Sequence, residues 1–368
     1  MAHDNNIYTS IDLALGEAID SYGSEWSNIV GNAKLNPSLL PGWMACVASA
    51  FGLFDKFRVY ILKRGEKIEG VVPFYIRRSK LSGVPVIRVE LGGNLVSYHQ
   101  ELITDSKHCL LLERFVDYLG EKYHWDIISA ENICIGSLTG KTIVNVCSER
   151  DVGLSSYPGE SSPYLVFDKD WKSILASKQK KFRYKVNKRE KILRDSDSLT
   201  IGWYTSPSDD IQRLVEEIFY VERDSWKADK GMAITGRQTE EAYYRLLVPY
   251  LANKGILFAS VLRKDGEAIA YNLCYKFNNC VGQLKTSYHN NYTAISPGAI
   301  LIEDALRKCI QEGISEFDFL GDIMPHKMAW TKSLRTHELI TIYNKSTKGR
   351  LLHTFSRTKK SIKKRLGL

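Results

Sequence analysis

Two stretches of the chain share one alternation of apolar and polar residues. Residues 59–78 (VYILKRGEKIEGVVPFYIRR) read as a strand, a tight turn at Gly65-Glu66 and a second strand. Residues 258–277 (FASVLRKDGEAIAYNLCYKF) repeat the pattern, and their Gly266-Glu267 pair lies 201 residues further on. The spacing of apolar residues therefore predicts a β-hairpin in each half of the chain.

The elements after the hairpins also correspond. Each hairpin is followed by a third strand, then a helix with an apolar stripe, then a strand that begins with an aromatic residue and Asp. The predicted strands lie at 86–93 and 281–288, the helices at 106–123 and 296–313, and the last strands begin at Trp125-Asp126 and Phe317-Asp318. The two Asp residues are 192 positions apart. This nearly constant offset predicts an α/β fold of two lobes, each with a mixed sheet and flanking helices, that arose by duplication.

The predicted domain boundaries follow from this repeat. The N-terminal lobe takes residues 1–155, the C-terminal lobe 156–344, and a tail 345–368, with 150–177 as the connection. The tail has apolar residues at helical spacing and predicts a basic amphipathic helix; these residues are Leu351, Phe355, Ile362 and Leu366.

Positive charge is concentrated in two segments. The chain has 368 residues and a net charge of +9, but 178–194 alone carries +8 and 345–368 carries +9. The remaining residues sum to −8, so the body is mildly acidic. Each basic segment is either a solvated helix face or a contact with an anionic partner: a cofactor phosphate, an acidic lipid surface or RNA.

Composition narrows the classes of protein. Charged residues make up 25% of the chain and hydrophobic residues 44%, as in globular proteins, and no stretch is long and apolar enough for a membrane span. The seven cysteines are scattered without a CxxC pair, and the first residues lack a secretory pattern, so we expect a cytoplasmic protein. No GxxxxGK[ST], HExxH or GxSxG motif occurs, which argues against an NTPase, a zinc protease and a serine hydrolase, and we expect no metal.

The start of the second helix has the pattern of a phosphate site. Ser296-Pro297-Gly298 supplies a residue typical of caps, a Pro suited to the first turn and a residue without a side chain. The backbone at Ser296, Gly298 and Ala299 is therefore the expected binding site for a cofactor phosphate. The first helix begins with Asp105-Ser106-Lys107 and has no Gly, so only the second lobe is expected to bind the anion.

The C-terminal half resembles a known group of enzymes. Tyr288, Ser296-Pro297-Gly298, Phe317-Asp318-Phe319-x-Gly321, Lys327 and Trp330 resemble the signature of the CelD-like acetyltransferases of the GNAT superfamily. Trp26, Asn36-Pro37, Trp43, the Val-Pro-Phe step at 72–74 and the basic segment resemble the rest of that pattern. The chain departs from the family at His326, His289 and Glu222, where Tyr, Asp and His are usual.

The resemblance implies an acyltransferase related to the Fem-type aminoacyl transferases, with acyl-CoA (acetyl-CoA in the simplest case) bound by the second lobe and the acceptor on the side of the first. It implies that Lys327 lies near the reacting carbonyl. Acyl transfer also needs oxyanion donors and a proton acceptor. The candidate donors are the backbone of 271–275 and Asn272, and the candidate proton acceptors are His99, Glu222, Asp318 and His326.

Further side chains are expected to contact the substrate: Tyr98, Arg183, Trp226, Tyr288, His326 and Trp330. Trp226 and Trp330 could equally belong to the core, and Asp318 could merely fix a strand end. The expected acceptor is an amine or hydroxyl of a small molecule or of a cell-envelope or polysaccharide precursor, including a lipid-linked one if the tail lies on an anionic membrane. Two alternatives stay open: a transferase that uses aminoacyl-tRNA, and a non-enzymatic RNA- or membrane-binding module.

Overall fold

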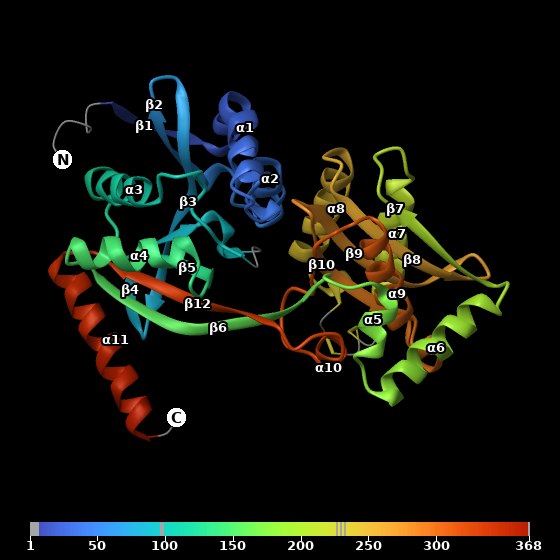
Figure 1. The fold of residues 1–368 in the computed structure, drawn as a ribbon. Coiled ribbons are helices and arrows are strands. Elements are labelled where there is room, and N and C mark those ends of the chain that lie inside the picture. Colours follow the sequence, from blue (N-terminus) through green and yellow to red (C-terminus); the bar gives the residue numbers. More distant parts are fainter. Residues whose placement is uncertain (1–6, 96–98, 226, 229, 232, 367–368) are drawn as a thin grey trace. The chain divides into compact units, whose positions relative to one another are not determined.

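The computed structural model describes residues 7–95, 99–225, 227–228, 230–231 and 233–366, with side chains as far as residue 358. The chain forms two compact units (Figure 1). Unit 1 contains residues up to Glu160 and those from Thr336 onward, and unit 2 contains Ser161–Arg335. No helix in the described part of the chain is both long and apolar enough to cross a membrane.

The sheet of unit 1 has the strand order β1-β2-β3-β4-β5-β12. These strands are β1 (Tyr8–Ala14), β2 (Arg58–Arg64), β3 (Lys67–Leu81), β4 (Val84–Leu91), β5 (Ile127–Cys134) and β12 (Leu334–Tyr343). The helices are α1 (Leu15–Asn32), α2 (Pro41–Ala50), α3 (His108–Lys122), α4 (Leu138–Glu149) and α11 (Thr347–Leu366). Helices α3 and α4 pack on one face through a core that includes Leu111, Phe115 and Ile143, and α1 and α2 lie on the other side of the strands (Figure 1).

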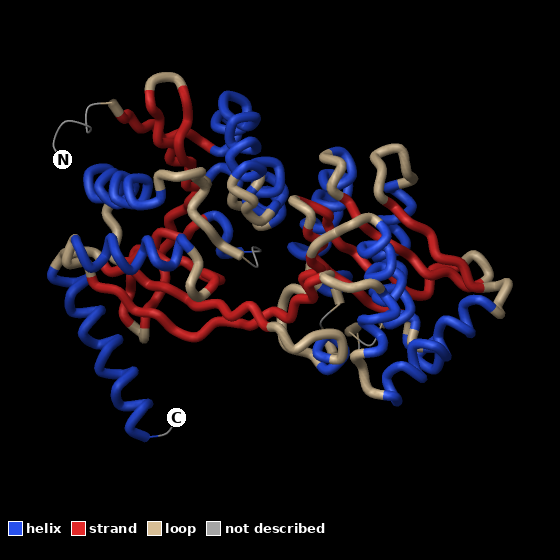
Figure 2. Tube along the Cα trace, in the orientation of Figure 1, coloured by secondary structure: helices blue, strands red, loops and turns tan. Residues whose placement is uncertain are grey.

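The sheet of unit 2 has the corresponding order β7-β8-β9-β10-β11-β6. Its strands are β7 (Leu199–Tyr204), β8 (Leu257–Lys264), β9 (Glu267–Phe277), β10 (Cys280–Tyr288), β11 (Glu316–Asp318) and the end of β6 (Gly153–Val166). The helices are α5 (Trp171–Ala176), α6 (Lys180–Arg194), α7 (Ile211–Arg223), α8 (Gln238–Asn253), α9 (Pro297–Gln311) and α10 (Pro325–Met328). Figure 2 shows helices flanking the strands in each unit.

The duplication extends to the details of the hairpins. The β2–β3 ladder shifts register between Leu62 and Lys63, and the β8–β9 ladder shifts between Leu262 and Arg263. In unit 1, β4 is antiparallel to β3 and parallel to β5. In unit 2, β10 is likewise antiparallel to β9 and parallel to β11. Gly65 and Gly266 have positive φ, which the tight hairpin turns require. The predicted α/β fold with mixed sheets is therefore the observed one.

The ends of the predicted lobes differ from the observed units. We expected 150–177 to be a connection, but 153–166 form strand β6, whose last residues pair with β11. Residues 336–343 belong to unit 1 rather than to the C-terminal lobe, because β12 pairs with β5. The sheet of each unit is therefore completed by a strand from a distant part of the chain.

The C-terminal tail is the basic helix that the spacing predicted. One side of α11 packs on unit 1: Leu352 is buried beside Tyr343, and Lys348 Nζ lies 2.7 Å from Asp126 Oδ2. Leu351 and Phe355 are 55% and 67% exposed, so this part of the apolar stripe faces away from the unit. The side chains of Ile362 and Leu366 lie outside the described residues.

Candidate functional site

Strands β10 and β11 separate soon after they begin to pair. They are in parallel register only from Cys280 to Gly282, opposite Glu316–Asp318. Beyond this point β10 continues to Tyr288, and its pairing with β9 shifts register after Gln283. Strand β11 ends at Asp318, and the chain then turns through Leu320 and Gly321, both at positive φ. The edge of β10 after Gly282 thus has no ladder with β11, and we call the place where the two strands separate the opening.

The backbone groups that face this opening follow from the strand alternation. His289 donates its N–H to Ile269 O on the β9 side, whereas Asn290 donates to Asp224 O on the other side. Since successive residues of a strand direct their backbone groups to opposite edges, Thr286 and Tyr288 face away from β9, into the opening. The segment after α7 runs along this edge, because Ser225 forms a bridge with His289.

Lys227 follows on this segment and extends to the edge of β10. Its Nζ donates to Thr286 O at 2.6 Å and lies 3.4 Å from Glu222 Oε1. The side chain is only 14% exposed. Burial lowers the pKa of Lys227 to about 8; the nearby Glu222 opposes this shift and Lys285 adds to it. Sequence reasoning missed Lys227, because only the fold shows that this lysine is buried.

Glu222, a predicted proton acceptor, lies inside unit 2 at the end of α7 and is fully buried. Besides the contact with Lys227, it accepts hydrogen bonds from Tyr271 Oη at 2.6 Å and from Ile234 N at 3.0 Å. Burial, and then the charge of Glu222, raise the pKa of Tyr271 well above its usual value. Glu222 is therefore best placed to hold Lys227 and Tyr271 in position.

Lys327 lies on the β11 side, in the short helix α10, and is 9% exposed. Its Nζ donates to Leu320 O, in the turn that follows β11. The neighbouring His326 has its pKa lowered by partial desolvation and then by the charges of Lys327 and Lys227. The charges of both lysines thus act on one imidazole.

Asp318, the other acidic candidate, fixes the end of β11. Its carboxylate accepts the Leu320 N–H at 2.9 Å and pairs with the Arg335 guanidinium. Arg335 also contacts Glu316, at 3.0 and 3.1 Å. A carboxylate that is held by a cation and an N–H is a weak proton acceptor, so these contacts favour the structural interpretation of Asp318.

The predicted oxyanion donors of β9 are already used. This strand pairs with β8 on one side and with β10 on the other, so the N–H groups of 271–275 belong to a sheet interior. Asn272 is buried, and its Oδ1 accepts from Gln283 Nε2 at 2.7 Å. Within the described residues, Gln283 Oε1 and Ser260 Oγ are buried without a hydrogen-bond partner. Ser260 stands opposite Asn272, so a polar group or water is expected beside this pair.

The start of α9 has fewer free donors than the pattern predicted. Ser296 adopts the left-handed conformation and its side chain makes no capping hydrogen bond. The N–H groups of Ser296 and Ala299 bond to Thr293 O and Ser296 O, both at 3.0 Å. Gly298 N–H has no acceptor in the described part of the chain. A Cβ at Gly298 would lie 3.4 Å from Cδ1 of Tyr288, whose ring packs in an apolar cluster with α9.

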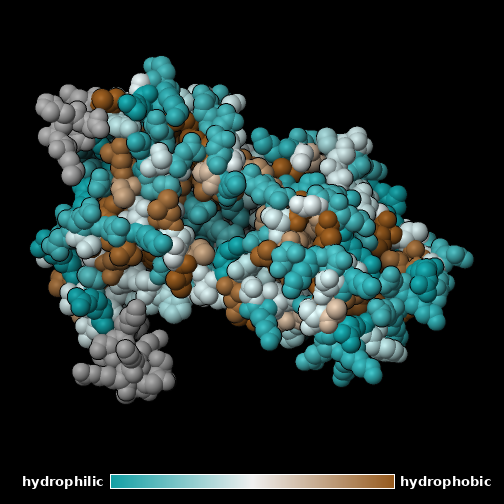
Figure 3. All heavy atoms as spheres, viewed as in Figure 1, coloured by the Kyte–Doolittle hydropathy of each residue, from teal (hydrophilic) through white to brown (hydrophobic). Residues whose placement is uncertain are grey.

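The basic helix α6 has a structural side and an exposed side. Val186 is buried, and Arg189 Nε lies 2.9 Å from Glu303 Oε1 on α9. Burial raises the pKa of Glu303 to about 7, and the Arg189 contact opposes that shift. The remaining face is hydrophilic, as the α6 region at the lower right of Figure 3 shows. Arg183 donates to Ala176 O at 3.1 Å and lines an open hollow of about 440 Å³.

Trp330 belongs to the core, as one of the two interpretations expected. It is 4% exposed, and its ring centroid lies 5.7 Å from Trp171 and 4.9 Å from Phe182. Tyr98 and Trp226 lie outside the described residues. His99 is in unit 1, where its Nδ1 lies 2.8 Å from Nε2 of the buried His337. The structure thus places Lys227 beside Glu222, and the charges of Lys227 and Lys327 both lower the pKa of His326. His99 belongs to the other unit.

In unit 1 the position that corresponds to the opening is filled by a side chain. After β4 the chain enters a short 3-10 helix, Gly92–Leu95, in which Asn94 reaches β5. Asn94 Nδ2 donates to Ser129 O at 2.8 Å and to Glu90 Oε2 at 2.7 Å, and its Oδ1 accepts from Glu131 N at 3.0 Å. Asn94 thereby joins β4 and β5 where β10 and β11 separate in unit 2.

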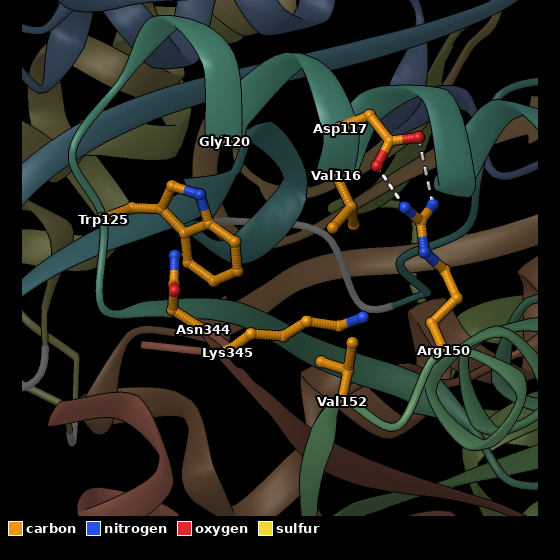
Figure 4. A pocket seen from close by; sticks show the side chains of 8 residues that line it. All are labelled: Val116, Asp117, Gly120, Trp125, Arg150, Val152, Asn344 and Lys345. Atoms are coloured by element: carbon orange, nitrogen blue, oxygen red, sulfur yellow. Dashed lines mark hydrogen bonds and ion pairs between the residues drawn. The ribbon is translucent and has the colours of Figure 1, made fainter. Parts of the chain in front are cut away.

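A small hollow of about 190 Å³ in unit 1 lies elsewhere, between α3, the end of α4 and the residues after β12 (Figure 4). Asp117 and Arg150 form an ion pair across it, and Trp125 and Lys345 line it. None of the predicted site residues lines this hollow. Among the described residues, no group of three or more His, Cys, Asp and Glu side chains could hold a metal ion.

Comparison with known proteins supports an acyltransferase. A family model described as an acetyltransferase (GNAT) domain matches residues 180–328, which contain the opening, the start of α9 and Lys327. A search among curated protein sequences gave no match.

Solved structures share the fold over nearly the whole chain. FemX superposes with a TM-score of 0.60 at 11% identity, over 90% of this chain and 96% of that chain. A conserved protein of unknown function from Bacteroides thetaiotaomicron gives 0.56 at 14% identity, over 91% and 99%. L-PGS from Bacillus licheniformis gives 0.53 at 11% identity, over 91% and 95%. At these identities the likeness concerns the fold alone.

Proposed function

We propose that this protein transfers an acyl group from acyl-CoA, acetyl-CoA in the simplest case, to an amine or hydroxyl. The observation that carries the proposal is the opening between β10 and β11 in unit 2. Asn94 fills its counterpart in unit 1. Beyond Gly282, the described residues that contact this edge of β10 are the segment after α7, through the Ser225 bridge, and the amine of Lys227. Backbone groups at a strand edge without a neighbouring strand are costly to leave unpaired, and an extended acyl-pantetheine chain could pair with them.

The residues around the opening fit such a donor. The Gly298 N–H, at the positive end of α9, suits the pyrophosphate. The backbone of Thr286 and Tyr288 faces the position proposed for the pantetheine arm, and Lys327 is the proposed partner of the thioester oxygen. The acceptor is assigned to the side of unit 1, whose own opening is filled. We favour a small-molecule or cell-envelope precursor as acceptor, in polysaccharide biosynthesis or a related pathway, and we propose that the enzyme is CelD-like.

Helix α11 suggests where the protein works. Leu351 and Phe355 are exposed on a helix whose segment, 345–368, contains no acidic residue. Such a surface complements an anionic membrane and would bring the enzyme to lipid-linked acceptors. All seven cysteines are free, which suits a reducing cytoplasm.

Aminoacyl-tRNA is the alternative donor, favoured by the exposed basic face of α6 and by the fold shared with FemX. The two donors differ in a binding experiment. CoA should raise the Tm with only a weak dependence on salt, because it carries few charges, whereas tRNA binding should weaken steeply as salt increases.

The direct test uses the Gly298→Val variant. Wild-type protein at a CoA concentration 100 times its Kd should gain about 2.7 kcal/mol, or roughly 5–10 °C in Tm for a unit of this size. Gly298→Val should lose this gain, because its methyl groups occupy the approach to the N–H. Gly120→Val in α3, where a Cβ meets nothing within 4 Å, is the matched control. Unchanged CoA binding by Gly298→Val would contradict the site.

A further inference from the structure

Lys227 has the geometry of a proton acceptor at the opening. Its Nζ lies at the edge of β10 on the side that β11 leaves open, since Thr286 O faces that side. The two contacts of this nitrogen, with Thr286 O and Glu222 Oε1, use two N–H donors. A neutral amine has two N–H groups and one lone pair, so both contacts can persist while the lone pair remains available.

We propose that Lys227 accepts the proton of the acceptor during acyl transfer, an inference that rests on the function proposed above. The acceptor's nitrogen or oxygen attacks the thioester carbonyl carbon and forms the new bond. The carbon–sulfur bond breaks, and CoA leaves as a thiolate. The proton of the nucleophile passes to Nζ of Lys227, which later returns it to the thiolate.

The surroundings of Lys227 lower its pKa, so that part of its amine is neutral near pH 7. Charged and titratable groups act on it from several elements: Glu222 on α7, Glu240 on α8, Lys285 on β10 and His326 on α10. Burial outweighs the two carboxylates and lowers the pKa of Lys227 to about 8. A group with this pKa combines a useful neutral fraction near pH 7 with enough basicity to take a proton.

The role differs from that of Lys327. Lys327 donates to Leu320 O, on the far side of the opening from Thr286, and its proposed task requires a permanent charge. Lys227 must instead lose its proton before each turnover. Arginine separates these roles, because it keeps the charge and the donors but does not deprotonate.

The experiment measures thiol release from acetyl-CoA with water and with a panel of amino sugars and amino acids as acceptors. Lys227→Arg and Lys227→Met should both lower kcat about 10²-fold or more. The wild-type kcat should rise with pH and level off above about 8. Lys285→Met removes a neighbouring positive charge, so it should move this rise to higher pH. Lys276→Met is the matched control, because Lys276 pairs with Glu312 at the surface.

A second measurement titrates Lys227 without turnover. Trace labelling with acetic anhydride, followed by mass spectrometry, should show half-maximal reactivity of Lys227 near pH 8, well below an ordinary lysine. Full activity of Lys227→Arg, or labelling like that of Lys276, would overturn the role of Lys227 while leaving the acyltransferase intact. If the wild-type protein neither releases thiol nor gains Tm with CoA, both proposals fail.

Discussion

Replacing Glu222 by Gln tests whether the buried cluster of unit 2 is organised by this one carboxylate. Glu222 is fully buried and is approached by three donors: Tyr271 Oη, Ile234 N and Lys227 Nζ. Glutamine has nearly the same shape, but it replaces one acceptor oxygen by an NH₂ group. One of the three donors then faces the NH₂ group of the glutamine instead of an acceptor oxygen. The ammonium of Lys227 also loses the negative charge beside it.

The cost should be large for a single-atom change. Breaking a buried charge pair typically costs about 3–5 kcal/mol, and the lower value applies here because Lys227 keeps its contact with Thr286 O. About 3 kcal/mol corresponds to a fall in Tm of roughly 6–12 °C for a unit of this size. Loss of the carboxylate also removes a charge that raises the pKa of Lys227. The pH at which Lys227 is half-labelled should therefore fall below 8.

The double variant Glu222→Gln/Lys227→Met provides the internal control. It removes the stranded ammonium, so its loss of stability should be smaller than the sum of the two single losses by about 2 kcal/mol. Thermal unfolding followed by circular dichroism, together with the labelling titration, measures both quantities. Additive losses, or an unchanged labelling pH in Glu222→Gln, would refute the coupling between Glu222 and Lys227.

Two further predictions concern other parts of the chain. Lys327→Met should lower kcat for acetyl-CoA about 10²-fold with little change in KM, because its charge interacts most strongly with the developing oxyanion; Lys332→Met is the control, and normal turnover would remove Lys327 from the mechanism. Leu351→Ser/Phe355→Ser should abolish co-sedimentation with phosphatidylglycerol vesicles at low salt without lowering the Tm, because both side chains are exposed. Leu138→Ser is the control, because it changes an exposed Leu of another helix and should leave vesicle binding intact. Failure of the wild-type protein to bind such vesicles would make α11 purely structural.

The elements of the fold could be predicted because their signals are local. An alternating strand, a turn with glycine at positive φ and an apolar stripe each depend on a few neighbouring residues. The hairpins at Gly65 and Gly266 and the helices α3, α9 and α11 therefore lie where the pattern placed them. The duplication could be predicted from the nearly constant distance in sequence between corresponding elements, 201 residues for the Gly-Glu pairs and 192 for the two Asp residues.

The strands that complete the sheets could not be predicted in this way. Strand β6 lies in the segment 150–177, whose Ser, Pro and Gly residues predicted a connection, and β12 lies after the last element of the repeated pattern. Their place is set by non-local pairing: β6 with β11, and β12 with β5. Lys227 escaped notice for the same reason, because its burial depends on β10 and α7 rather than on its neighbours in sequence.

The two units show why an opening is better evidence for a site than any one residue in it. A duplicated sheet inherits the same diverging strands in both copies, and each copy must satisfy the exposed backbone groups or leave them for a ligand. Unit 1 satisfies them with one side chain, since Asn94 contacts Ser129 O and Glu131 N on β5. In unit 2 the corresponding edge contacts instead the amine of Lys227, whose protonation can change. A sheet selected for stability alone would favour the first arrangement, so the second is the one expected where a substrate enters.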